Sequence, residues 1–319
     1  MNKVTGALIG LGLGGVILVT AACGGPIKFP GFTKSEDADT VVAETGTEDA
    51  DIPSPVEETE PATPADNPAP EEPIQVEPTF SYLPAGQLIP GSGTGTTDET
   101  VYAPDILFPV EEAPAYLQSM VWKLGGGILG GDQCDPSNYQ YPWQDNFCEK
   151  RTSDFSTPTC PTARVHLGQD IRVGSPEDCN VLRSTDSEER KLHRVIAVED
   201  GVISSIGRYT VTLRSGPRIY RYMHLNMAAL EVEAGDLVSA GDPIGFVSND
   251  FGGTPTTFHL HFEIRQNLPG TAWAFVPPYR SLVAAYERRE AGPGEEVEPA
   301  VQAAFSDAIL PPADFVITE

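Results

Sequence analysis

The sequence predicts an antiparallel all-β fold for the second half of the chain. Short runs rich in β-branched and aromatic residues, separated by Gly, Asp, Asn and Pro, are typical of strands. Four such runs lie at residues 195–198, 201–206, 209–213 and 219–223. No helical pattern separates them, although the crossovers of a parallel sheet would require one. We therefore expect successive strands to pair in antiparallel order.

The N-terminus has the features of an export signal. Lys3 precedes an uncharged apolar stretch that ends in Ala21-Ala22 before Cys23, as in a secretory signal peptide. The Ala-Ala-Cys-Gly junction resembles the lipobox of bacterial lipoproteins, except for Thr20, where that family usually has Leu. The resemblance implies a signal peptide at residues 1–23 and a lipid on Cys23. The alternative is an uncleaved membrane anchor, for which the five glycines of the stretch are poor helix formers.

Either interpretation places the rest of the chain outside the cytoplasmic membrane. We expect an exported, lipid-anchored protein in the periplasm, with the outer membrane as the favoured anchor site.

Residues 24–100 are expected to be a disordered, acidic, Pro-rich linker. They contain too few apolar residues to offset the entropy of the chain. Residues 1–122 carry 3 Lys+Arg and 19 Asp+Glu, a net charge of −16 out of −26 for the whole chain. This acidity excludes nucleic-acid binding driven by phosphate neutralisation. The linker is either a tether with a span of roughly 50 Å or a spacer of no specific length.

Four cysteines follow Cys23 and fall within 46 residues: Cys134, Cys148, Cys160 and Cys179. An even number in an exported chain predicts disulfides, and the absence of a CxxC pair argues against a structural zinc cluster. Three connectivities are possible. We favour Cys134 with Cys148 and Cys160 with Cys179, because each bond closes a short loop and would contribute about 3 kcal/mol.

Closely spaced turns follow the predicted strands. Gly235-Asp236 and Gly241-Asp242 interrupt apolar stretches six residues apart, which bends a ribbon sharply. This segment, at residues 231–247, resembles the hybrid β-motif of biotinyl and lipoyl carriers, sugar-transport phosphocarriers and lysostaphin-type metallopeptidases. The resemblance implies a two-sheet hybrid-motif fold with an open groove, but a fold does not specify a function.

The C-terminal end of the chain predicts short helices. Residues 279–289 and 298–310 have helical patterns, and Pro299 stands at the start of the second. We therefore expect a globular domain at residues 101–286 with a disulfide-bearing lead-in, followed by an acidic tail with a short helix at residues 287–319.

Residues that bind metals stand in two motifs. His166 and Asp170 lie four residues apart, and His259 and His261 lie in the strand-like sequence His-Leu-His-Phe-Glu. A period of two places both histidines on one face of that strand. Burying two imidazoles beside a hydrophobic core costs free energy unless a bonding partner or a metal ion satisfies them. Two imidazoles and a carboxylate suit a catalytic zinc ion with a fourth position for water.

These motifs, with a Tyr-x-His-Leu strand end at His224, resemble the lysostaphin-type zinc peptidases of bacterial cell walls over roughly residues 160–266. The resemblance implies that one Zn²⁺ per chain is bound by His166, Asp170 and His261. It also implies that the catalytic histidines are His224 and His259.

The chain departs from the family pattern in two segments. Residues 174–194 are a long insertion, and residues 131–160 are a cysteine-bearing lead-in; both are expected to reshape the groove. His193 lies outside every motif, and we expect it to be an exposed structural residue.

The implied activity is hydrolysis of peptide cross-links in peptidoglycan. Zinc lowers the pKa of bound water towards about 7, and one catalytic histidine would accept the proton of this water while the other stabilises the oxyanion. No HExxH motif is present, so a helix-borne Glu is not the base. The expected partners are peptidoglycan peptide stems, the membrane through its lipid anchor, and an activator protein of unknown identity.

Two other functions remain open. A non-catalytic peptidoglycan-binding lipoprotein, or an activator of other wall hydrolases, would need no ligand set, yet every ligand of the motif is present. A carrier domain with the same hybrid motif would need a modifiable Lys or a phosphorylatable His, and residues 235–245 contain no Lys.

Overall fold

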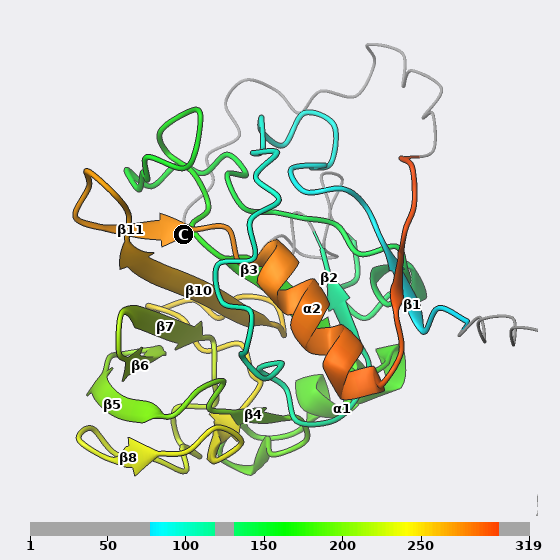
Figure 1. The fold of residues 1–319 in the computed structure, drawn as a ribbon. Helices are drawn as coiled ribbons and strands as arrows, with labels where there is room; N and C mark the ends of the chain where they lie inside the picture. The colour runs from blue at the N-terminus through cyan, green and yellow to red at the C-terminus, as the bar shows by residue number, and fades with distance from the viewer. Residues whose placement is uncertain (1–76, 119–130, 300–319) are drawn as a thin grey trace, which may run out of the picture. The chain divides into compact units, whose positions relative to one another are not determined.

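The computed structural model describes residues 77–118 and 131–299, and an eight-stranded sheet dominates this part of the chain (Figure 1). Its strands follow the order β2-β3-β10-β7-β6-β5-β8, with β11 paired to β10, and all these pairings are antiparallel. The strands are β2 (Ala115–Leu117), β3 (Gln169–Val173), β5 (Gly201–Ile206), β6 (Thr210–Ser215), β7 (Arg218–Met223), β8 (Leu237–Val238), β10 (Leu260–Asn267) and β11 (Trp273–Val276). The predicted all-β fold is confirmed.

A second, small sheet supports the two-sheet arrangement. β4 (Arg194–Ile196) pairs with β9 (Pro243–Phe246) in antiparallel order. The turns at Gly235 and Gly241 have φ of 104° and 93°, a region that glycine adopts without steric cost. These turns direct the chain into β8 and β9, as the spacing of the two Gly-Asp pairs predicted.

Strand β10 lies between β3 and β7 and presents two different faces. Leu260, Phe262 and Ile264 have no exposed surface and belong to the hydrophobic core. Because side chains alternate along a strand, His261 and Glu263 point to the opposite face. They are also buried, so the polar face of β10 is covered as well.

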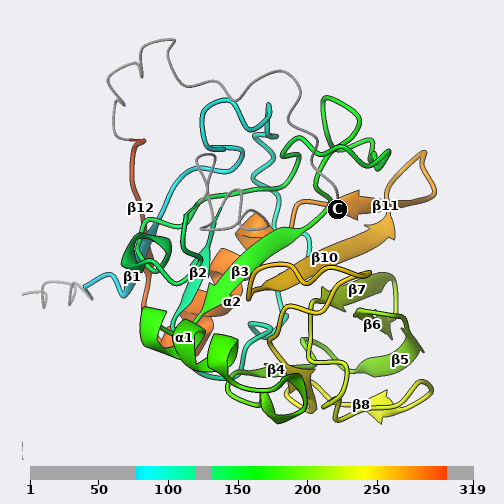
Figure 2. The same cartoon turned by 180° about the vertical axis from the view of Figure 1, so that it is seen from behind.

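Helix α2 (Tyr279–Glu290) confirms the helix predicted at residues 279–289. It lies in front of β3 in Figure 1 and behind it in Figure 2, so it covers one face of the main sheet. Leu282, Val283 and Tyr286 anchor it in the core. The helix predicted at residues 298–310 falls outside the described residues from residue 300 onwards. Within the described part, no helix is long and apolar enough to cross a membrane.

The folded part begins before the predicted boundary at residue 101. β1 (Phe80–Tyr82) pairs in parallel with β12 (Gly294–Glu296), and both aromatic side chains of β1 are buried. Gly294 permits this contact, because a Cβ there would lie 2.6 Å from the Phe80 ring. The packed chain thus includes the end of the predicted linker and the start of the predicted tail. Residues 1–76, with the predicted signal peptide and Cys23, lie outside the described residues.

Both disulfides form with a connectivity other than the favoured one. Cys134 is bonded to Cys179, and Cys148 is bonded to Cys160. The Cα atoms of these pairs are 5.4 and 5.5 Å apart. The favoured pairing of Cys134 with Cys148 and of Cys160 with Cys179, chosen because each bond closes a short loop, is therefore wrong.

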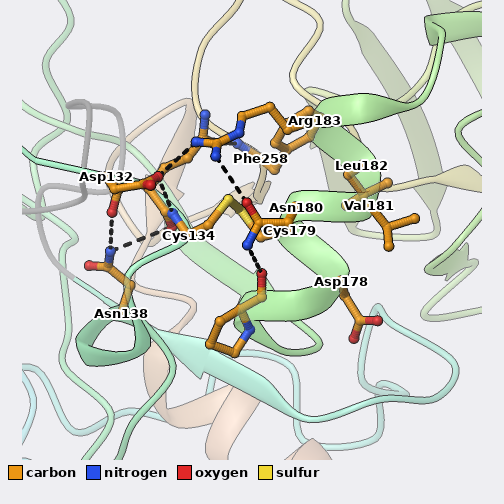
Figure 3. The surroundings of a disulfide bond; sticks show 12 residues. Asp132, Cys134, Asn138, Asp178, Cys179, Asn180, Val181, Leu182, Arg183 and Phe258 are labelled. Carbon is orange, nitrogen blue, oxygen red and sulfur yellow. Dashed lines mark hydrogen bonds and ion pairs between the residues drawn. A yellow bond between two sulfur atoms is a disulfide. The ribbon is translucent and has the colours of Figure 1, made fainter.

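The packing of helix α1 (Pro176–Ser184) explains the first of these bonds (Figure 3). Arg183 at its end forms an ion pair with Asp132, with Nη1 2.8 Å from Oδ1. Leu182 and Phe258 pack with the two cysteines in a small apolar cluster. The contact between α1 and residues 131–139, rather than the length of the closed loop, decides which cysteines meet.

Candidate metal centre

Two adjacent strands bring the three predicted ligands together. Asp170 of β3 and His261 of β10 are direct partners in the sheet register. His166 precedes β3, and its backbone N–H donates to the carbonyl of Glu149, 2.7 Å away, which fixes its position. Side chains far apart in the sequence therefore converge because the sheet register aligns them.

The donor atoms of these residues lie within hydrogen-bonding distance of one another. His166 Nε2 is 2.8 Å from His261 Nδ1 and 3.2 Å from Asp170 Oδ1, and His261 Nδ1 is 2.9 Å from the same oxygen. Ligand atoms around one tetrahedral zinc ion are about 3.3 Å apart, so the donor set fits zinc. Within the described residues, no other group of three His, Cys, Asp or Glu side chains converges in this way. Their role as ligands stays a prediction.

The outer atom of each predicted ligand is bonded to a further residue. His166 Nδ1 donates to the Asn146 carbonyl over 2.9 Å, and His261 Nε2 donates to Glu263 Oε1 over 3.1 Å. Asp170 Oδ2 accepts from Asn146 Nδ2 over 2.8 Å. Such outer hydrogen bonds fix the tautomer of a ligating histidine and direct its lone pair inwards. The inner atoms of all three residues are thereby left to face one another.

Sequence reasoning did not identify these outer partners. Glu263 stands in the His-Leu-His-Phe-Glu motif, and the alternation that paired His259 with His261 also places Glu263 on their face. Asn146 belongs to no motif and gives no such signal. Arginines add positive charge further out: Arg221 Nη1 lies 2.6 Å from Glu263 Oε2, and Arg151 Nη2 lies 3.7 Å from Asp170 Oδ2.

The two predicted catalytic histidines lie beside the cluster. The ring centroids of His224 and His259 are 4.7 Å apart, and His259 Nε2 is 3.5 Å from Asp170 Oδ1. His224 Nδ1 donates to the Asp250 carbonyl over 2.9 Å, and His259 Nδ1 donates to the Thr257 carbonyl over 2.8 Å. When Nδ1 carries the hydrogen, Nε2 of a neutral ring carries the lone pair. Both Nε2 atoms are thus acceptors.

The environment favours the neutral form of these two rings. Burial lowers the pKa of His224 well below 6.5, and the neighbouring His259 and His261 lower it further. Burial also lowers the pKa of His259, although Asp170 partly opposes this shift. A ring that is neutral near pH 7 can accept a proton from water.

The environment favours the charged forms of two predicted ligands, Asp170 and His261. Burial alone would raise the pKa of Asp170, but His166 and His259 bring it well below 3.8. Burial would lower the pKa of His261, yet hydrogen bonds to Asp170 and Glu263 raise it to about 9. The cluster therefore contains an ionised carboxylate that attracts positive charge, either a proton on His261 or a metal cation.

Little of this cluster reaches solvent. The five predicted site residues are between 1% and 6% exposed, so the expected open groove does not expose them. Tyr209 and Phe251 cover His224, with ring centroids 6.1 and 5.4 Å from its own. Neighbouring groups thus cover most of the surface of these five residues.

His193 is buried, and the prediction that it is exposed is wrong. It is 5% exposed, and its Nε2 lies 3.8 Å from Asp178 Oδ2. A Cβ on Gly174 would lie 2.5 Å from this nitrogen, so the glycine makes room for the ring. The insertion folds into α1 and then returns to Gly174 at the end of β3, and this packing buries His193. His193 takes no part in the metal centre.

A known family model matches part of the chain. Residues 182–272 match the model of peptidase family M23; this range includes His224, His259 and His261, while His166 and Asp170 precede it. No curated protein matches the chain.

Several solved structures are similar to part of the chain. The catalytic domain of the antimicrobial peptidase lysostaphin from Staphylococcus simulans is 23% identical, with a TM-score of 0.27, over 37% of this chain and 80% of that one. A catalytic-domain mutant of the prophage-encoded M23 protein EnpA from Enterococcus faecalis is 21% identical, with a TM-score of 0.25, over 43% and 93%. A zinc-containing peptidase from Vibrio cholerae is 20% identical, with a TM-score of 0.24, over 38% and 33%. On the strength of the family match, residues 182–272 resemble a domain of peptidase family M23.

Proposed function

We propose that this protein is a zinc-dependent endopeptidase that hydrolyses peptide cross-links of peptidoglycan. The observation that carries the proposal is the convergence of His166, Asp170 and His261, with donor atoms 2.8 to 3.2 Å apart, beside two further histidines. The family match at residues 182–272 supports a metallopeptidase. The substrate class is inferred from the family resemblance.

In this proposal, His166 Nε2, Asp170 Oδ1 and His261 Nδ1 hold the metal. A bound zinc ion supplies Lewis-acid chemistry, which acidifies water and polarises a carbonyl group. Asn146 and Glu263 keep the three donor atoms directed inwards through their outer hydrogen bonds. The protein thus provides three ligands and not four, the number typical of catalytic rather than structural zinc.

The two remaining histidines move the proton. His259 Nε2, 3.5 Å from Asp170 Oδ1, is close enough to the ligand cluster to accept the proton of an attacking water. The ring that has gained this proton then donates it to the leaving nitrogen. The same Nδ1 arrangement makes neutral His224 an acceptor, so His224 can stabilise an oxyanion only in its protonated form.

Digestion of purified sacculi tests this proposal. We expect the zinc-loaded protein to release muropeptides whose masses identify the cleaved bond, and we expect His261→Ala to release none. Zinc binding without any release from sacculi or from defined cross-linked peptides would contradict the enzymatic proposal.

The covered cluster supports a second candidate function. A non-catalytic peptidoglycan-binding protein, or an activator of another hydrolase, needs no access to residues that are 1–6% exposed. Co-sedimentation with sacculi, unchanged in His261→Ala and without muropeptide release by the wild type, would favour this candidate over the enzyme.

We also propose that the protein is exported and anchored by a lipid on Cys23. The support is the sequence of residues 1–23. Replacing Cys23 with Ala should release the protein from membranes or block its maturation. Unchanged membrane fractionation, with no acyl mass on the wild-type N-terminus, would argue for an uncleaved helix or a soluble secreted form.

A further inference from the structure

The lead-in segment runs alongside the residues that precede β3. The Cys148 N–H donates to the His166 carbonyl over 3.0 Å, and the His166 N–H donates to the Glu149 carbonyl over 2.7 Å. Lys150 and Val165 form a further antiparallel bridge. The segment at residues 146–151 thus pairs with the backbone that carries the first predicted ligand. It lies outside the residues that match the family model.

Asn146 contacts two of the three predicted ligands with three separate groups. Its backbone carbonyl accepts from His166 Nδ1 over 2.9 Å. Its side-chain Nδ2 donates to Asp170 Oδ2 over 2.8 Å, and its Oδ1 accepts from the Asp170 backbone N–H over 3.1 Å. The residue has no exposed surface, so these hydrogen bonds form away from competing water.

Both ends of the asparagine amide are needed for this arrangement. The neutral amide donates to the carboxylate through Nδ2 and accepts from the backbone N–H through Oδ1 at the same time. The bond to Asp170 Oδ2 leaves Oδ1 directed at His166 and His261, 3.2 and 2.9 Å away. An aspartate would lack the donor, and an alanine would leave a buried carboxylate oxygen and a backbone N–H without these partners.

The residues on either side hold Asn146 in place. Asp145 accepts from the backbone N–H groups of Gly86 and Phe147, each over 2.9 Å. Two residues after Asn146, Cys148 is tied to Cys160 by a disulfide. The position of Asn146 is therefore set by the lead-in and not by the sheet that carries the ligands.

From these contacts we infer that Asn146 is a positioning residue of the metal centre, which orients His166 and Asp170 and thereby raises the affinity for zinc. The inference rests on the proposed function, because it takes His166 and Asp170 to be metal ligands. It makes the cysteine-bearing lead-in a part of the site. Loss of an outer hydrogen-bond partner typically weakens metal binding by about 10- to 100-fold.

The test is the zinc dissociation constant of the full chain, measured by competition with a chromogenic chelator. We expect Asn146→Ala to weaken zinc binding by about 10- to 100-fold. Asn138→Ala is the matched control, because Asn138 is another buried asparagine of the lead-in and its amide donates to the Asp132 carbonyl over 3.1 Å. This control should bind zinc as the wild type does.

A spectroscopic measurement distinguishes a change in ligand geometry from a general loss of packing in the lead-in segment. The visible absorption of the Co²⁺-substituted protein reports ligand geometry, and it should change in Asn146→Ala but not in Asn138→Ala. If Asn146→Ala does not fold, as judged by circular dichroism, Asn146→Ser is measured in its place.

The outcomes distinguish the inference from the proposed function. A wild-type protein that binds no zinc contradicts the proposed function itself. Tight binding by the wild type, with equal affinity and an equal Co²⁺ spectrum in the Asn146 variant, overturns the inference alone. An equal loss in Asn138→Ala would also overturn it, because loosening of the lead-in would then explain both results.

Discussion

Glu263 accepts a hydrogen bond from His261, with 3.1 Å between Oε1 and Nε2, although the two residues lie on the same strand. Alternation along β10 places them on one face, two residues apart. The second carboxylate oxygen, Oε2, is 2.6 Å from Nη1 of Arg221, the register partner of Glu263 on β7. A chain of three side chains thus joins the predicted ligand to the neighbouring strand.

This relationship predicts that Glu263→Gln weakens zinc binding. Glutamine removes the negative charge that keeps His261 oriented with its Nδ1 directed inwards, and the expected loss of affinity is about 10- to 100-fold. Competition with a chelator measures it. Glu199→Gln is the control, since Glu199 pairs with Arg218 over 2.9 Å outside the metal centre. Equal zinc affinities in Glu263→Gln and Glu199→Gln would show that Glu263 does not support the metal centre.

Removal of a predicted ligand should abolish metal binding and hydrolysis together. We expect neither His261→Ala nor Asp170→Ala to retain zinc through gel filtration, because three protein ligands are typical of a catalytic zinc site. Atomic absorption of the filtered protein gives the zinc content. Full occupancy in either variant would show that the replaced residue is not a ligand.

Removal of a predicted catalytic histidine should separate metal binding from activity. His224→Ala and His259→Ala are expected to retain zinc and to lower turnover by about 10²- to 10⁴-fold, the usual contribution of general acid–base catalysis. Zinc content and muropeptide release are measured on the same samples. If zinc is lost from His259→Ala but kept by His261→Ala, the roles of His259 and His261 are reversed.

His193 should make folding stability depend on pH. Burial lowers the pKa of folded His193 below 6.5, and Asp178 only partly opposes this shift. The unfolded chain therefore binds a proton that the folded protein does not, and the stabilisation is present above pH 6.5 and lost as the pH falls below it.

Denaturation by urea at pH 7.5 and 5.5 measures this effect. We expect the free energy of unfolding to fall less between these pH values in His193→Asn than in the wild type. The comparison removes the contributions of the other titrating groups, which both proteins share. An identical decrease in both proteins would mean that His193 is protonated to the same extent in the folded and unfolded states.

The two disulfides should differ in their effect on stability. Cys134 and Cys179 are 45 residues apart, whereas Cys148 and Cys160 are 12 apart. By the chain-entropy relation, replacing the first pair with serines should cost about 4 kcal/mol and the second about 3 kcal/mol. Mass mapping of non-reduced digests checks the pairing itself. A peptide joining Cys134 to Cys148 would contradict the connectivity.

Local periodicity made the central strands and much of the site predictable. The runs at residues 201–206 and 219–223 match β5 and β7 closely, because alternation records which side chains face the core. The same rule placed His259 and His261 on one face before any fold was known. The spacing of His166 and Asp170 predicted that these two residues act together, and their donor atoms do lie close together, with His166 Nε2 3.2 Å from Asp170 Oδ1.

Contacts between distant segments were not predictable in this way. The pairing of β1 with β12 joins residues more than 200 positions apart. The short sequence of β1 contains no pattern that identifies the strand with which it pairs. The burial of His193 depends on how an insertion folds back, and no motif around this residue indicated it. Each of these contacts results from the packing of several elements, not from a local pattern.

The sequence by itself determined the strands, the order of the motifs and the residue types of the proposed metal centre, because these follow from local periodicity and side-chain chemistry. Only the tertiary structure decided that Cys134 meets Cys179 and that Asn146 meets His166 and Asp170. The physical reason is that a local pattern specifies which face a side chain occupies, whereas the free energy of the whole packed core selects which distant faces come into contact.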